Sequence, residues 1–220
     1  MRDQSSSRWR RSIYPNINGT SDVKAEASRF IKAFIDIDIA PEGCVPVTGS
    51  MQGTYASFLV CGQCTPGKDT ILFIDPGFPV QKQQITVMGY RYESFDVYEY
   101  RGEKLRDILE QYLSKGNIAA MIYSNPNNPA WFCLTEEELK IIGDMANKYD
   151  TIVIEDLAYF AMDFRKPLGK PFEAPFQATV AVIRIITFCR FRDQKHSAMP
   201  ASVLGSRQSP TNYITEPIPD

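Results

Sequence analysis

The chain has 220 residues, of which 44% are hydrophobic and 23% charged, so it can bury one sizeable core or two small ones. Its net charge of −2 gives no electrostatic footprint for nucleic acid, and no apolar run reaches the roughly 20 residues of a membrane span. We therefore expect neither a nucleic-acid nor a membrane partner. Residues 1–12 are basic and polar without the apolar core of a secretory signal, and we interpret them as an irregular N-terminal segment.

Short apolar runs alternate with amphipathic segments in the first half of the chain, which is typical of βα units around a parallel sheet. Residues 21–37 are predicted to form a helix whose inward face holds Val23, Ala27, Phe30 and Phe34. Further along we expect strand 45–48, a helix from Ser50 through Val60, strand 70–74 and a β-rich segment at 87–100.

The second half of the chain continues the same alternation. Residues 102–116 read as a helix stopped by Gly116, with inward side chains at Leu105, Ile108, Leu109 and Tyr112. A buried strand is expected at 118–123 and another at 151–155. Between these strands, Thr135 and Glu138 have the spacing of a capping box, and the helix they open is predicted to bury Leu139, Ile142, Met145, Ala146 and Tyr149.

Four of the predicted strands end in polar or glycine-bearing loops. These loops are Gly49-Ser50, residues 75–78, residues 124–129 and residues 156–159. Ligands of open α/β sheets bind beyond the carboxyl ends of the strands, so we expect the four loops to share one site.

The first two loops offer a phosphate seat and an aromatic ring. Ser50 and Met51 open a helix directly after a strand, where free backbone N–H groups and the helix dipole favour an anion. Phe78 lies between Gly77 and Pro79 and could stack on a flat cofactor ring. Taken alone, the first fits an ordinary βα turn better and the second fits a hydrophobic plug better.

The last two loops carry amides, a carboxylate and a hydroxyl. The segment SNPNNP, residues 124–129, holds amide side chains on a backbone that its prolines stiffen. Asp156 follows a nearly all-apolar strand, where a carboxylate needs a partner such as a protonated ring nitrogen, and Tyr159 offers a hydroxyl nearby. A plain turn, a helix N-cap and a packed ring are the structural alternatives.

The combination of NPNNP at 125–129 with a following strand and Asp156-x-x-Tyr159 resembles the fold-type-I pyridoxal-phosphate (PLP) enzymes, specifically the class I and II aminotransferases. The resemblance covers roughly residues 12–181. It implies an α/β fold with three layers, in which a mostly parallel sheet has helices on both faces. It also implies an enzyme that transfers an amino group from an amino acid to a 2-oxo acid, with PLP as cofactor.

The resemblance assigns a place at the cofactor to each of several residues. Ser50 and Met51 would lie at the phosphate, and Phe78 would stack on the pyridine ring. Asn128 and Tyr159 would hydrogen-bond the ring 3′-oxygen, and Asp156 would pair with the pyridinium nitrogen. Tyr14 matches a tyrosine that reaches the phosphate of a neighbouring subunit, which implies a homodimer. The sequence departs from the family at Ala130-Trp131, where a small polar residue and a glycine usually follow NNP.

The family pattern fades after Ala181. The resemblance requires a catalytic lysine in a Ser-x-Ser-Lys-like loop, with an arginine eight residues later, and then a small C-terminal domain. If one nucleotide is missing after codon 181, the degenerate codons of residues 182–219 permit a peptide that contains SGSK followed by that arginine. In this reading Lys195 falls at the lysine's number only because two lysine codons overlap, so no catalytic residue is assigned.

These observations predict a partial PLP-binding large domain at 13–181 and a non-family, out-of-frame tail at 182–220. The small C-terminal domain is expected to be absent, the homodimer impaired, PLP binding weak and the chain inactive. The β-branched run IRIITFCRF, residues 183–191, could still add a strand to the sheet.

Two further readings stay open. One is a non-catalytic α/β module that binds a phosphate-bearing ligand through the same loops. The other is a redox protein that uses Cys61-Gly-Gln-Cys64, although no second cysteine pair completes a metal site and the five cysteines do not suggest a disulfide framework. Free cysteines and the lack of a targeting segment lead us to expect a cytoplasmic location.

Overall fold

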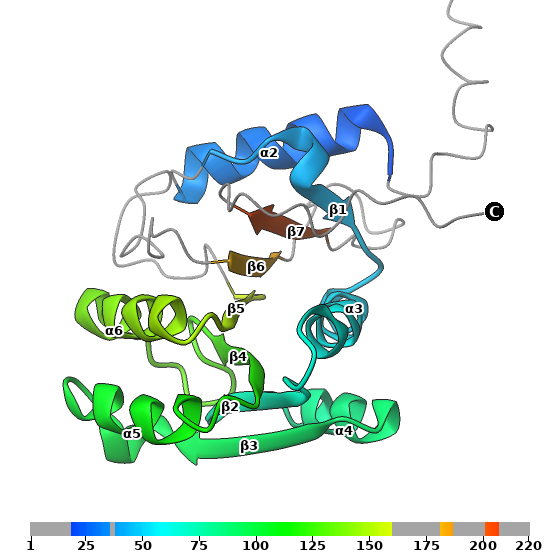
Figure 1. The fold of residues 1–220 in the computed structure, drawn as a ribbon. Coiled ribbons are helices and arrows are strands. Elements are labelled where there is room, and N and C mark those ends of the chain that lie inside the picture. Colours follow the sequence, from blue (N-terminus) through cyan, green and yellow to red (C-terminus); the bar gives the residue numbers. More distant parts are fainter. Residues whose placement is uncertain (1–18, 36–37, 160–180, 187–200, 207–220) are drawn as a thin grey trace, which may run out of the picture.

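The computed structural model describes residues 19–35, 38–159, 181–186 and 201–206 (Figure 1). Tyr14 and Lys195 lie outside the described residues. In chain order the elements are α2 (Ser21–Ile35), η1 (Pro41–Gly43), β1 (Cys44–Pro46), α3 (Ser50–Cys64), β2 (Thr70–Asp75), α4 (Pro79–Met88), β3 (Arg91–Asp96), η2 (Val97–Tyr100), α5 (Lys104–Leu113), β4 (Ile118–Ser124), α6 (Glu136–Lys148), β5 (Ile152–Leu157), β6 (Ala181–Ile186) and β7 (Ala201–Ser206).

One seven-stranded sheet organises the molecule, in the order β1-β7-β6-β5-β4-β2-β3. Strands β3, β2, β4, β5 and β6 run parallel to one another, whereas β7 is antiparallel to both β6 and β1. Helices α5 and α6 cover one face of the sheet, and α3 and α4 cover the other (Figure 1). The predicted three-layer, mostly parallel α/β fold is therefore confirmed.

The central strands are buried on both faces, which explains their continuous apolar runs. Along β2, Ile71 and Phe73 pack into the cluster that contains Phe58 and Ile85 of α3 and α4, while Leu72 and Ile74 pack into the cluster under α5 and α6. From Ala120 to Tyr123, strand β4 alternates in the same way between the two clusters. The alternation follows from the two-residue period of a strand.

The predicted inward face of helix α2 is confirmed at Ala27 and wrong at Val23, while the side chain of Phe34 lies outside the described residues. The sequence pattern placed Val23 inward, but Val23 is 46% exposed, while Ile31 is fully buried and Ala27 nearly so. Among the described elements the helix packs mainly against β1 and η1, and its buried row runs from Ala27 to Ile31.

Helix α4 was missed by the sequence analysis, although it has clear end signals. Pro79 occupies its first turn, and Gly89 ends it in the left-handed conformation with φ 76°. The helix is hard to recognise in the sequence PVQKQQITVM, because only Gln81 and Ile85 are buried and the apolar periodicity is weak. The glutamine at a buried position proves important for the site.

The tail contributes two strands to the sheet. The strand that IRIITFCRF allowed is present as β6, which pairs with β5 from Val182 to Ile186, whereas β7 was not expected. Residues 182–186 and 201–206 of the predicted tail are therefore paired within the sheet. A run of β-branched residues can fill a parallel strand whatever its origin.

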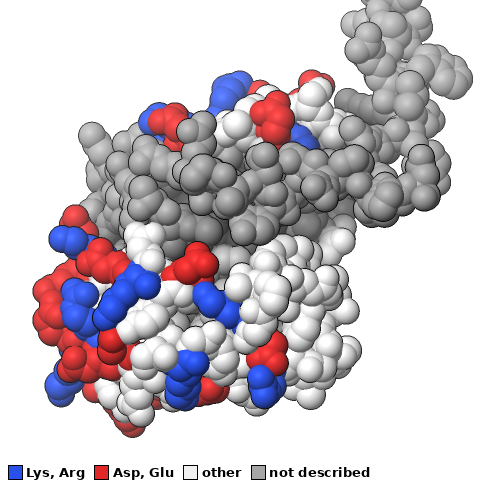
Figure 2. Space-filling model, in the orientation of Figure 1, with Lys and Arg blue, Asp and Glu red and all other residues white. Residues whose placement is uncertain are grey.

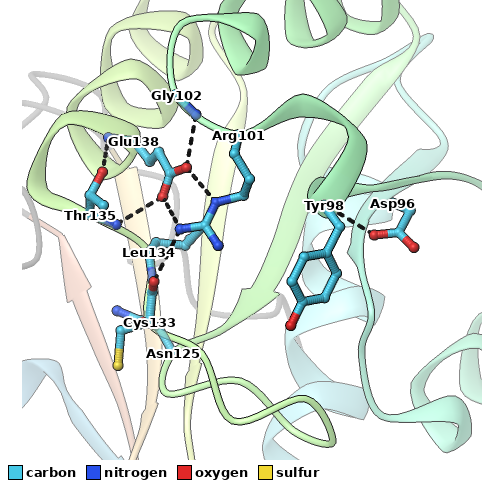
Figure 3. Close-up of polar contacts among 9 residues, drawn as sticks. All are labelled: Asp96, Tyr98, Arg101, Gly102, Asn125, Cys133, Leu134, Thr135 and Glu138. Carbon is cyan, nitrogen blue, oxygen red and sulfur yellow. Dashed lines mark hydrogen bonds and ion pairs between the residues drawn. The ribbon is translucent and has the colours of Figure 1, made fainter.

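A buried carboxylate, Glu138, joins α6 to the chain before α5 (Figure 3). Glu138 is 2% exposed and accepts hydrogen bonds from Arg101 Nε at 2.5 Å and from the backbone N–H groups of Gly102 and Thr135, both at 2.9 Å. Thr135 Oγ1 accepts in turn from the Glu138 N–H, which confirms the predicted capping box. Burial opposes ionisation, but these donors and the Arg101 charge hold the pKa of Glu138 below its ordinary value.

We expect Glu138→Gln to lower the unfolding free energy at pH 7 by about 2–4 kcal/mol, because the Arg101 guanidinium loses its buried counter-charge. A lowered folded pKa stabilises the protein above the ordinary carboxyl pKa of about 4.3 and loses that contribution as the pH falls through the folded value. The difference between the wild type and the variant should therefore shrink below pH 4. Urea unfolding at pH 7 and pH 3.5 measures it, and an equal difference at both values would contradict the assignment.

Candidate functional site

The carboxyl ends of β2, β4 and β5 meet at one edge of the sheet, because the three strands are parallel neighbours. Contacts between the following loops gather the predicted residues there. Asn127 Nδ2 donates to the Pro76 carbonyl at 2.7 Å, which joins the loop after β4 to the loop after β2. The Asn125 N–H donates to the Asp156 carbonyl at 3.1 Å, which joins it to the end of β5.

Asp156 is a buried charged group at this edge, with 7% of its surface exposed. Gln81 Nε2 of α4 donates to Asp156 Oδ2 at 2.8 Å, and the Ala158 N–H donates to Oδ1 at 3.2 Å. Burial raises the pKa of Asp156, although both hydrogen bonds favour the ionised form and oppose this rise. The carboxylate is thus held in one orientation but carries no neutralising charge among the described residues.

In the loop 124–132, the side chain of Asn127 is used in structural hydrogen bonds between described residues, whereas that of Asn128 is not. Asn127 is 2% exposed, and its Oδ1 accepts from the Ala130 N–H at 3.1 Å in addition to its bond with Pro76. Asn128 is half-buried, its N–H donates to Ser124 Oγ at 2.9 Å, and its side-chain amide takes part in no hydrogen bond between described residues. Only the second amide is therefore available to a ligand.

Phe78 is the N-cap residue of α4 and is half-buried, directly after the carboxyl end of β2. One turn later on the same helix comes Gln81, which contacts Asp156. The ring and the carboxylate are thus tied to each other through the first turn of α4.

Helix α3 begins at Ser50 and is preceded by Gly49, whose φ of 86° would strain any other residue. Met51 is 48% exposed, and Ser50 is half-buried. The helix start is fixed from outside, because Gln84 Nε2 of α4 donates to the Met51 carbonyl at 2.8 Å. The first turn of α3, whose first backbone N–H groups can bind an anion, is therefore held in place by α4.

Tyr159 contacts Trp131 across the site, with ring centroids 5.3 Å apart and ring planes tilted by 54°. Trp131 stands at the position where the sequence departs from the family pattern, and its φ of 54° lies in the left-handed region. A glycine would adopt this conformation without steric cost, so the tryptophan accepts strain of about 1 kcal/mol there. In this conformation the indole ring of Trp131 packs against the ring of Tyr159.

The structure therefore brings Ser50, Met51, Phe78, Asn128, Asp156 and Tyr159 to one edge of the sheet, while Tyr14 lies outside the described residues. Sequence reasoning missed Gln81 and Gln84. Their three-residue spacing after Phe78 was a usable signal, because it places all three on one face of a helix.

A family model described as "Aminotransferase class I and II" matches residues 3–184 of the chain. The chain belongs to the class I and II aminotransferases. Enzymes of this family use PLP, and the family match ends close to the boundary at which the sequence pattern fades.

Among curated aminotransferases, the chain is 29% identical over 150 residues to the glutamate-pyruvate aminotransferase AlaC of Escherichia coli, covering 66% of this chain and 35% of AlaC. It is 31% identical over 161 residues to the L-glutamine--4-(methylsulfanyl)-2-oxobutanoate aminotransferase of Bacillus subtilis, covering 71% of this chain and 39% of that enzyme. The chain thus spans little more than a third of the length of these aminotransferases.

Solved structures agree on the fold. An aminotransferase from Mycobacterium tuberculosis superimposes with a TM-score of 0.71 at 15% identity, covering 91% of this chain and 53% of the other. Substrate-bound BacF from Bacillus subtilis gives a TM-score of 0.70 at 21% identity, covering 89% and 49%. At such identities the likeness establishes the aminotransferase fold and nothing finer.

The redox alternative is not favoured by the structure. Cys61 and Cys64 lie in the last turn of α3, and burial raises the pKa of both thiols, that of Cys61 to about 12. A redox pair needs a thiol of lowered pKa. The described residues also contain no group of three or more His, Cys, Asp or Glu side chains placed to hold a metal ion. None of their helices is long and apolar enough to cross a membrane.

Asp156→Asn should raise the unfolding free energy of the ligand-free protein at pH 7 by roughly 1–3 kcal/mol, because it removes a buried charge while the Gln81 amide can turn to keep its bond. A raised folded pKa makes Asp156 cost stability as the pH rises above the ordinary aspartate value of about 3.9. The advantage of the variant should therefore grow between pH 4 and pH 7. Urea titrations at both values test this, and a variant less stable than the wild type at pH 7 would refute it.

Proposed function

We propose that the described loops form the PLP site of an aminotransferase that moves an amino group from an amino acid to a 2-oxo acid. One observation carries the proposal, namely the buried Asp156 carboxylate at the carboxyl edge of β5. Natural proteins bury such a charge where a ligand supplies the missing partner. The family membership names that ligand class as PLP.

The donor set around Asp156 fits a protonated pyridine nitrogen. An ionised carboxylate offers about four lone-pair positions, and Gln81 and Ala158 occupy two of them. A ring N–H can use a third, so that Asp156 keeps the proton on the ring nitrogen. When bound, PLP supplies the electron sink that transamination requires.

The other proposed contacts follow the same geometry. The Asn128 amide and the Tyr159 hydroxyl would donate to the ring 3′-oxygen, and Phe78 would cover a face of the ring. The Ser50 and Met51 N–H groups would receive the phosphate at the start of α3, and Tyr14 would reach the phosphate of a second copy. Each of these residues binds or orients, so binding of PLP can be tested separately from turnover.

The test is a fluorescence titration of the purified chain with PLP, at pH 7, for the wild type and Asp156→Asn. We expect weak, saturable binding by the wild type, and at least a tenfold loss in the variant because the pyridinium partner is gone. Gln111→Glu, an exposed change on α5, serves as a control and should bind like the wild type. Equal affinity of wild type and Asp156→Asn would reject the site.

We further propose that the gene lost one nucleotide after codon 181 and that the chain is catalytically inactive for that reason. The family match ends at residue 184, and the shifted frame of residues 182–219 permits the lysine loop and the following arginine. Restoring the frame would supply the lysine that transamination requires.

Sequencing the gene around codon 181 decides the frame hypothesis. We expect the shifted frame to encode SGSK with its lysine at position 195, and a product with the restored frame to transaminate amino acids where the present chain does not. A nucleotide sequence that yields no such peptide, or transaminase activity in the present chain lost on Lys195→Ala, would contradict this proposal.

Homodimer formation, which the resemblance implies, has a suitable surface on α3. This helix carries no charged residue along SMQGTYASFLVCGQC, and Met51, Tyr55 and Leu59 form a stripe at four-residue spacing with exposures of 48%, 41% and 39%. Figure 2 shows charged side chains gathered over α5 and α6, whereas the surface over α3 is uncharged. We propose that two copies meet through this stripe, next to the proposed phosphate seat.

Sedimentation velocity across a concentration series tests the surface. Self-association of the wild type should weaken at least tenfold in Leu59→Glu, since a buried charge opposes an apolar contact. Gln111→Glu adds the same charge on the opposite face of the sheet and should leave association unchanged. A wild type that stays monomeric at all concentrations would remove the proposed interface.

A further inference from the structure

Helix α4 presents three side chains to the site at a spacing of three residues. Phe78 caps the helix, Gln81 reaches the β5 end and Gln84 reaches the α3 start. The two amides therefore hold the two parts of the site that would bind opposite ends of the cofactor, namely the carboxylate for the ring nitrogen and the backbone for the phosphate.

Both amides are committed to these contacts. Gln81 is 5% exposed and donates to Asp156 Oδ2 at 2.8 Å. Gln84 donates to the Met51 carbonyl at 2.8 Å, and its Oε1 accepts from Thr54 Oγ1 at 2.7 Å. Thr54 is itself 1% exposed. A glutamine held at both ends of its amide has lost its rotational freedom before any ligand arrives.

We propose that Gln81 and Gln84 are positioning residues that fix, through one rigid helix turn, the distance between the pyridinium partner and the phosphate seat. The two residues are about 4.5 Å apart along the helix axis. PLP is a stiff ligand, so both of its ends fit only when this distance is set in advance. This inference rests on the proposed PLP site and adds the two residues that set its geometry.

The two residues act on different ends of the ligand, and this makes their roles separable. Pyridoxal has the ring of PLP without the phosphate. Gln84→Met should weaken PLP binding about three- to tenfold, the effect of one lost hydrogen bond, while leaving pyridoxal affinity unchanged. Gln81→Met should weaken PLP and pyridoxal by the same factor, about tenfold, because the ring nitrogen is common to both.

The experiment measures dissociation constants for PLP and pyridoxal by fluorescence for the wild type and both variants. Gln83→Met is the matched control, because Gln83 is the exposed neighbour on the same helix. Thr54→Val, which removes the hydroxyl partner of Gln84, should mimic Gln84→Met, and the double variant should be no worse than Gln84→Met alone.

A second readout needs no ligand. Amide hydrogen exchange at Gln52 and Gly53 in the first turn of α3 should accelerate severalfold in Gln84→Met but not in Gln83→Met, because the outside brace on that turn is gone. Unchanged exchange, or a Gln84→Met variant whose PLP and pyridoxal affinities fall together, would overturn the positioning role. A wild type that binds neither ligand would overturn the proposed function itself, and the positioning role with it.

Discussion

The carboxylate of Asp156 is the constraint around which the carboxyl edge of the sheet is built. Buried charge costs free energy unless donors surround it, and the chain provides two of these donors from different elements, the Gln81 amide of α4 and the Ala158 N–H after β5. Supplying the first donor requires α4 to run along the edge. That course in turn places Phe78 and Gln84 beside β2 and α3. The placement of Phe78 and Gln84 thus follows from the hydrogen bond that Gln81 donates to Asp156.

A second buried carboxylate, Glu138, stabilises the same edge from the opposite face. Its bonds to Arg101 and Thr135 fix the start of α6, and Arg101 also donates to the Cys133 carbonyl at 3.3 Å. The loop 124–134 is therefore anchored at its end by this cluster and at its start by Ser124 and Asn125. The two carboxylates differ in their electrostatics: donors and a nearby positive charge keep the pKa of Glu138 low, whereas burial raises the pKa of Asp156. The first has a charged partner within the protein, whereas the second has two hydrogen-bond donors and no neutralising charge among the described residues.

The sequence could predict most of the sheet and the placement of the site, because strands buried on both faces leave long apolar runs such as IAAMIYS and their loops must then gather at one edge. The capping box at Thr135 could also be predicted, because it depends only on the three-residue spacing between Thr135 and Glu138. Helix α4 was not predicted, because a helix that braces polar groups buries glutamines rather than a continuous apolar stripe. Its partners lie 75 and 33 residues away in sequence, as Asp156 and Met51, so no local pattern identifies them. The burial of Ile31 in place of Val23 has the same cause, because it depends on which elements α2 contacts.

The tail shows how differently fold and chemistry depend on sequence. Residues 182–186 complete a parallel strand beside β5, and residues 201–206 pair antiparallel to it, although the family match ends at residue 184. An interior strand asks only for β-branched and apolar residues, which many reading frames supply, so a sheet of this kind accepts a change of frame at low cost. A catalytic lysine cannot be replaced in this way, because covalent catalysis requires its amino group at a defined position in the site. The proposed shift in frame would therefore preserve the architecture around Asp156 while removing the lysine that transamination requires.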